Sequence, residues 1–149
     1  MGIVKKYYKG LIVAVVLFMS FSIFVLKDTN EELFRKTVFI GQEQVEALIV
    51  YRDEDLKRGL SGREFLNDQE GMLFVFPYED FHGIWMKNML FPIDIIWIQN
   101  GRVVDLKRDA RPDTYPYVFM PKEKASHVLE VSAGFVKGHD ILIGMPVSF

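Results

Sequence analysis

Three polar residues, Lys87, Asn88 and Asp94, stand within one of the most apolar stretches of the chain, Gly83 to Val104. Burying a charged group costs free energy unless the group is paired. Lysine and asparagine donate hydrogen bonds, whereas Asp94 and the later Glu130 accept them. These residues therefore need either a structural partner or a chemical role.

The structural interpretation places Lys87 and Asp94 on either side of the segment 88–93. If this segment is a tight connection between adjacent strands, the two side chains can face each other. They would then form an internal ion pair, or the carboxylate would cap the N–H groups of a loop.

The functional interpretation is a polar patch at a groove. Lys87 and Asn88 would be the donors, and Asp94 and Glu130 the acceptors, for a sugar or another small polar ligand. An aromatic wall for stacking would come from Trp85 or Trp97.

Catalysis is a separate alternative, in which Asp94 acts with Glu130 or Lys87 in a hydrolase. A pair of carboxyl groups can perform acid–base work on a glycoside. The chain has no Gly-x-Ser-x-Gly motif for a serine nucleophile. Its three histidines are too dispersed for a helix-borne metal motif. We therefore expect no metal and no cofactor, and leave open whether the protein is an enzyme. The histidines are His82, His127 and His139.

The composition restricts the classes of protein further. The chain has 149 residues, a formal net charge of −2 and no cysteine. The absence of cysteine excludes disulfides, thiolate metal sites and a lipid-anchor cysteine. Because there is no basic excess, we expect no nucleic-acid partner.

An uncharged run from Gly10 to Leu26 follows Lys5, Lys6 and Lys9. At 1.5 Å per residue it spans roughly 25 Å as a helix, close to the hydrocarbon thickness of a membrane. Lysines on the N-terminal side place the N-terminus in the cytoplasm. We predict a signal anchor and linker over 1–29 and an extracytoplasmic domain over 30–149; a cleaved, secreted form is the alternative.

The domain reads as many short β-strands with two short helices. Asn100-Gly101 between two apolar runs is the signal of a type I′ hairpin. We expect Asp53 and Ser132 to cap the helices, the chain to leave the sheet at 106–109, and 110–124 to form a long loop. The predicted fold is mainly β, a compact antiparallel β-sandwich or squashed barrel after an N-terminal transmembrane helix. Its strands are expected at 37–40, 44–51, 71–76, 93–98, 102–104, 127–131, 141–143 and 146–149, and its helices at 53–58 and 133–139.

Three motifs resemble the DUF192 family, also called UPF0127, over roughly Thr37 to Phe149. The most specific is Trp85-Met86-Lys87-Asn88 followed by Pro92-Ile93-Asp94. The others are Arg58-Gly59-Leu60 with Arg63 and Gly71-Met72-Leu73-Phe74, and Val128-Leu129-Glu130-Val131 with Ala133-Gly134-Phe135. The resemblance implies a compact β-domain, often behind a signal sequence or membrane anchor, without an established activity. It also adds Arg63 to the candidate ligand-binding residues Trp85, Lys87, Asn88, Asp94 and Glu130.

Three functions are compatible with these observations. The first is a membrane-tethered, non-catalytic binding module for a small polar or glycan ligand or a partner protein. The second is the hydrolase, and the third is a structural accessory domain. They differ in whether the polar residues converge at an open pocket or are buried and fully paired.

Overall fold

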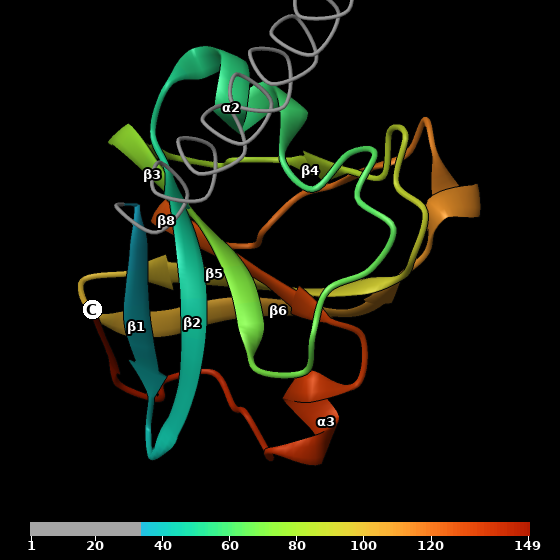
Figure 1. Cartoon of the computed structure of the whole chain (residues 1–149). Helices are drawn as coiled ribbons and strands as arrows, with labels where there is room; N and C mark the ends of the chain where they lie inside the picture. The colour runs from blue at the N-terminus through green and yellow to red at the C-terminus, as the bar shows by residue number, and fades with distance from the viewer. Residues whose placement is uncertain (1–33) are drawn as a thin grey trace, which may run out of the picture. The chain divides into compact units, whose positions relative to one another are not determined.

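The computed structural model describes residues 34–149, and Arg35–Phe149 forms one compact unit. Figure 1 shows its strands and short helices. In chain order the elements are β1 (Arg35–Ile40), β2 (Glu43–Val50), α2 (Asp53–Arg58), β3 (Glu70–Asp80), β4 (Ile84–Trp85), β5 (Ile93–Gln99), β6 (Arg102–Ala110), the 3-10 helix η1 (Pro112–Thr114), β7 (Val118–Phe119), β8 (Ala125–Ser132), α3 (Phe135–Gly138) and β9 (Val147–Ser148).

Seven strands form one curled sheet in the order β6-β5-β8-β3-β2-β1-β9, and β4 pairs with β7 in a separate ribbon. All pairs are antiparallel except β2 and β3, which are parallel and joined through α2. An isolated bridge from Arg102 to Pro146 links the start of β6 to the segment before β9. The predicted mainly-β class with two short helices is confirmed, but the sheet is a half-barrel rather than two stacked sheets.

The central hairpin has the predicted turn. Gln99 pairs with Arg102, and the two residues between them both have positive φ, 50° at Asn100 and 67° at Gly101. This is the combination that a type I′ turn requires.

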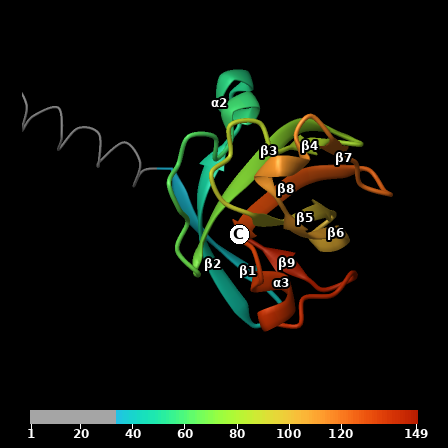
Figure 2. The same cartoon turned by 90° about the vertical axis from the view of Figure 1, so that its right-hand side faces the viewer.

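Each face of the sheet carries its own hydrophobic cluster. Val38, Val45, Ile96 and Leu129 belong to the first cluster, which also contains residues of α3. The second contains Phe74, Ile95, Trp97 and Val128, with Leu60 and Ile84 from the segments around α2 and β4. Figures 1 and 2 show α2 and β4 at one end of the sheet and α3 at the other. Because both clusters are built from residues 38–147, the fragment 30–149 contains both of them and we expect it to fold by itself.

Four expectations about the strands and loops were wrong. β3 continues through Pro77 to Asp80, with an irregular register after Val75, where proline is tolerated. Residues 106–109 stay in β6, because Leu106 and Lys107 pair with β5. The stretch 110–124 contains η1 and β7 instead of being an uninterrupted loop, and 141–143 is not a strand.

The predicted helix caps were also wrong. Arg52 precedes α2, and Asp53 lies in its first turn without capping it. Gly134 precedes α3, whereas the hydroxyl of Ser132 donates to the carbonyl of Leu66, 2.8 Å away. The predicted anchor lies outside the described residues. Within 34–149, no helix combines the length and apolar character that crossing a membrane requires.

Candidate functional site

A pocket of about 400 Å³ opens beside the second hydrophobic cluster. Its walls come from α2 and the turn after it, from β3, and from the ribbon of β4 and β7. Among residues 34–149, Glu130 of β8 is the only acidic side chain that lines it. We call it the Glu130 pocket; its lining residues are Leu56, Lys57, Arg58, Gly59, Leu60, Ser61, Phe74, Phe76, Gly83, Ile84, Trp85, Met89, Val118, Met120 and Glu130.

The strand register places Glu130 on this face of the sheet. It pairs with Met72 of β3 and Ile95 of β5, both of which belong to the second cluster. Directly paired residues point to the same face, so the carboxyl group is surrounded by apolar side chains. Only 5% of Glu130 is exposed.

The Glu130 carboxyl lacks the partners that a buried charge needs. Its Oε2 atom is buried and has no hydrogen-bond partner among the described residues. Burial raises the pKa of Glu130 to about 8, because removal from water disfavours the charged form. At pH 7 the pocket therefore contains a carboxylic acid that is mostly neutral.

Gly59 lies beside this carboxyl and leaves room for the ring of Phe74. It ends α2 with a φ of +51°, and its N–H donates to the carbonyl of Asp55 at 2.8 Å. A Cβ atom here would stand 3.2 Å from the ring of Phe74 and 3.8 Å from Glu130 Oε2. The glycine of the Arg58-Gly59-Leu60 motif thus serves both the turn and the pocket.

Trp85 is a pocket wall, and Lys87 lies next to it. Trp85 is 43% exposed, and the Lys87 ammonium stands 5.5 Å from the centre of its ring. Trp97, the alternative stacking residue, is instead buried in the core, where its indole N–H donates to the carbonyl of His82 at 2.8 Å. Of the two candidate stacking residues, Trp85 lines the pocket and Trp97 belongs to the buried core.

Asn88 and Arg63 belong to two loops that are tied together. The N–H of Gly62 donates to the carbonyl of Asn88, 3.0 Å away, and the Ser61 hydroxyl donates to the carbonyl of Lys87, 2.8 Å away. Asn88 has a φ of 56°, a conformation that asparagine tolerates better than most residues. Neither Asn88 nor the half-buried Arg63 lines the pocket.

Asp94 accepts hydrogen bonds from backbone N–H groups and does not pair with a cation among residues 34–149. One carboxylate oxygen accepts the N–H of Asp109 at 2.8 Å, and the other accepts those of Gly134 at 3.1 Å and Val136 at 2.9 Å. The expected ion pair with Lys87 was therefore wrong, whereas the alternative of a carboxylate that caps N–H groups is confirmed. Asp94 fixes the end of β6 and the start of α3.

Asp94 and Glu130 lie on opposite faces of the sheet. Asp94 pairs with Val131, and Glu130 pairs with Ile95. Since successive side chains in a strand point to opposite faces, the two carboxyl groups cannot face each other. The expected convergence of these residues was wrong, and the hydrolase hypothesis loses its pair of acids.

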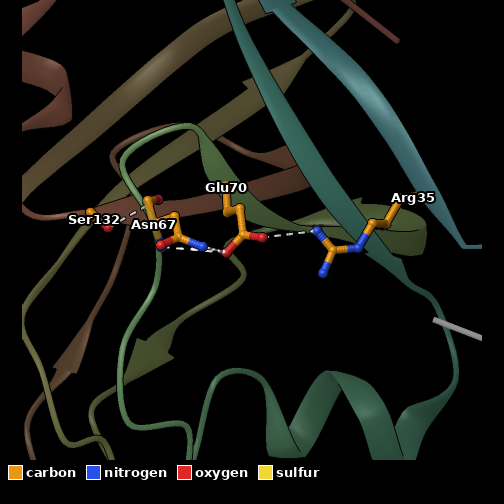
Figure 3. A network of polar contacts seen from close by, with 4 residues as sticks. All are labelled: Arg35, Asn67, Glu70 and Ser132. Atoms are coloured by element: carbon orange, nitrogen blue, oxygen red, sulfur yellow. Dashed lines mark hydrogen bonds and ion pairs between the residues drawn. The ribbon is translucent and has the colours of Figure 1, made fainter. Parts of the chain in front are cut away.

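A separate polar network fixes the chain between α2 and β3. Glu70 accepts hydrogen bonds from Arg35 at 3.2 Å and from the Asn67 amide at 2.9 Å, and Ser132 donates to the carbonyl oxygen of Asn67 (Figure 3). The Ser132 hydroxyl also donates to the carbonyl oxygen of Leu66. Burial raises the pKa of Glu70, but the hydrogen bonds from Arg35 and Asn67 outweigh this effect and hold the pKa below its ordinary value. The network is paired and lies outside the Glu130 pocket.

The histidines are separate in space as well as in sequence. His82 stacks on Phe76, His127 lies against Phe149, and His139 pairs with Glu43 at 2.8 Å. Within residues 34–149, no three histidine, aspartate or glutamate side chains are grouped as a metal site would require.

Comparison with known proteins identifies the family. The sequence profile of DUF192, described as an uncharacterised group, matches residues 36–149. The chain therefore belongs to the DUF192 family. No curated protein matches the sequence significantly.

Two solved structures have the same fold. A protein of unknown function from Novosphingobium aromaticivorans is 24% identical with a TM-score of 0.74, over 77% of this chain and 85% of that one. A protein from Sinorhizobium meliloti, described as a candidate transcription regulator, is 24% identical with a TM-score of 0.71, over 76% and 91% of the two chains. At this identity the likeness extends to the fold alone.

Proposed function

We propose that this protein is a membrane-tethered, extracytoplasmic binding module that holds a small ligand in the Glu130 pocket without catalysing a reaction. The observation that carries the proposal is the buried, unpartnered Oε2 atom of Glu130 at a pocket with aromatic walls. A buried polar atom without a partner is costly, and a ligand that supplies the missing hydrogen bond would offset that cost.

The size and lining of the pocket support a small ligand. Its volume of about 400 Å³ falls within the range of pockets that hold small molecules. Phe74, Phe76 and Trp85 offer ring surfaces, and Val118 and Met120 extend the apolar wall. The ligand is accordingly a molecule with an apolar face and at least one hydrogen-bonding group, a description that a glycan can meet and a fully polar ligand cannot.

Binding is favoured over hydrolysis because no second acid lies beside Glu130 among the described residues that line the pocket. The charged residues that line the pocket with it are Lys57 and Arg58, and both are exposed. An acid–base pair of carboxyl groups would need a second acid on the same face, and Asp94 lies on the other.

The proposed membrane tether is supported by the sequence alone. Gly10 to Leu26 has no charge and follows three lysines, so the domain would lie outside the cytoplasm. Protease added to spheroplasts should degrade the domain while the membrane stays intact. Full protection of the domain would contradict this location.

The binding proposal can be tested by thermal shift with libraries of glycans and metabolites. A ligand that binds only the folded state raises the melting temperature. Val118→Trp should fill the pocket and abolish the shift, whereas Leu142→Trp is a matched control because Leu142 is 57% exposed and does not line the pocket. If the hits stabilise both variants equally, they bind elsewhere and the proposed site is wrong.

A further inference from the structure

We infer that the ligand of the Glu130 pocket carries a primary ammonium group on an apolar body about the size of one ring, and that this ammonium donates hydrogen bonds to the Glu130 carboxylate. The inference rests on the proposed function and specifies the class of its ligand. It depends on the unpartnered acceptor, on the lining of the pocket, and on the charges around Glu130.

The first observation is the acceptor itself. Oε2 of Glu130 is buried and unpartnered among residues 34–149. The side chains of its strand neighbours Met72 and Ile95 are apolar and have no hydrogen-bond donor. The protein thus leaves one hydrogen-bonding position open on a group that becomes a strong acceptor when it ionises.

The second observation is the aromatic lining. Phe74, Phe76 and Trp85 all line the pocket that contains Glu130. Aromatic faces attract cations through the ring quadrupole, and Trp does so most strongly. Lys87 already stands over the Trp85 ring, so this indole presents a face to a cation in the protein itself.

The third observation is the balance of charge around Glu130. From α2, Lys57 and Arg58 line the pocket, and Arg58 is paired with Asp55 at 2.6 Å. From β3, β4, β5 and β7, the residues that face the pocket or pair with Glu130 are uncharged. A further cation beside the pocket is Lys87, which follows β4 and holds its ammonium over the Trp85 ring. Neither cation of α2 forms an ion pair with Glu130, and a bound ammonium would supply that missing partner.

Binding of the ammonium is coupled to loss of a proton. The neutral acid gives its proton to solvent, and the resulting carboxylate pairs with the ligand cation, so charge and protons balance. Because burial raises the pKa of Glu130 to about 8, nearly one proton should be released for each ligand bound at pH 7. The affinity for an amine should therefore rise about 50-fold from pH 6 to pH 8.

The two tryptophans of the chain provide a direct readout. The full chain would be labelled with 5-fluorotryptophan, placed in lipid nanodiscs and followed by fluorine NMR. Trp85 lines the pocket, and the buried Trp97 is an internal control for folding. The probes are benzylamine and its neutral counterpart of equal size, benzyl alcohol.

Benzylamine should shift the Trp85 resonance, with a dissociation constant that falls about 50-fold from pH 6 to pH 8. Benzyl alcohol should bind without this gain. Glu130→Gln should remove the pH dependence and lower the affinity for benzylamine at pH 8 to that for benzyl alcohol. An unchanged Trp97 resonance in this variant would report a native fold. These three results together support the inference.

Three other results would overturn it, in ways that can be told apart. If both probes shift Trp85 with equal affinity at pH 8, or Glu130→Gln binds the amine as tightly as the unaltered chain, the pocket binds ligands but does not select an ammonium. If neither probe shifts Trp85 at any pH, the inference fails and the pocket loses its proposed function as well.

Discussion

Replacing Glu130 with Gln should make the protein more stable at alkaline pH and leave it nearly unchanged at pH 5. The two side chains have almost the same shape, but glutamine has no charge to bury. Burial raises the pKa of Glu130 to about 8 in the folded state, compared with an ordinary value of 4.5. Between these two values the unfolded chain ionises at this position and the folded chain does not.

The sign of the effect follows from proton binding. In this pH range the folded state binds more protons than the unfolded state, so stability falls as pH rises. The contribution of Glu130 is fully present below pH 4.5 and is lost as pH rises toward 8. At 1.36 kcal/mol per pH unit, the unaltered protein should lose roughly 3 to 4 kcal/mol relative to Glu130→Gln between pH 5 and pH 8.

Urea unfolding of the 30–149 fragment at pH 5, 6, 7 and 8 would measure this difference. Glu123→Gln is the matched control, because Glu123 is exposed and should follow the unaltered fragment at every pH. A constant difference between the unaltered fragment and Glu130→Gln across the series would refute the reasoning. It would mean that Glu130 is ionised in the folded protein and has a partner.

Three further predictions concern the fold. Asp94→Ala leaves three N–H groups without their acceptor and should lower the free energy of unfolding in urea by roughly 3 to 5 kcal/mol. Lys87→Ala should lower it by less than about 1 kcal/mol. Equal losses in the two variants would support an ion pair between Lys87 and Asp94. Gly101→Ala should lower stability by about 1 kcal/mol because of its positive φ, while Gly138→Ala should not, and similar melting temperatures would argue against the type I′ turn. Burial raises the pKa of Glu70, but hydrogen bonds from Arg35 and Asn67 outweigh this effect and lower the pKa overall. Glu70 should therefore stabilise the protein above pH 4.5, and this stabilisation should be lost as the pH falls further. Glu70→Gln should reduce the loss of stability at acid pH, and an unchanged loss would contradict this.

Local patterns in the sequence were sufficient for much of the fold. Asn100-Gly101 specified the central turn, because only a few residues accept positive φ at both positions. The apolar run at 93–98 predicted a strand beside this turn, and β5 is buried on both faces. The short strand β7 was missed because two residues, Val118 and Phe119, are too few to show a period.

The candidate site could be predicted only in part. Glu130 was predicted as a hydrogen-bond acceptor and Trp85 as a stacking residue, and both line the pocket. Phe76 and Met120 were not recognised, because they reach the pocket through long-range packing of β3 and the segment after β7. Nothing local distinguishes such residues from ordinary core residues.

The roles of the two buried carboxyl groups depended on strand register. The pairing of Ile95 with Glu130 places Asp94 on the opposite face. A shift of one residue would have placed both acids on the same face. Register is set by contacts between strands that are distant in sequence, so Asp94 could not be separated from Glu130 by spacing alone.

The most direct test of the central claim is a crystal structure of the protein with a ligand selected by thermal shift. We expect the ligand in the Glu130 pocket, against the Trp85 ring and within hydrogen-bond distance of the Glu130 carboxyl group. A ligand bound at another surface, with the same pocket empty and Glu130 still unpartnered, would contradict the claim that this pocket is the functional site.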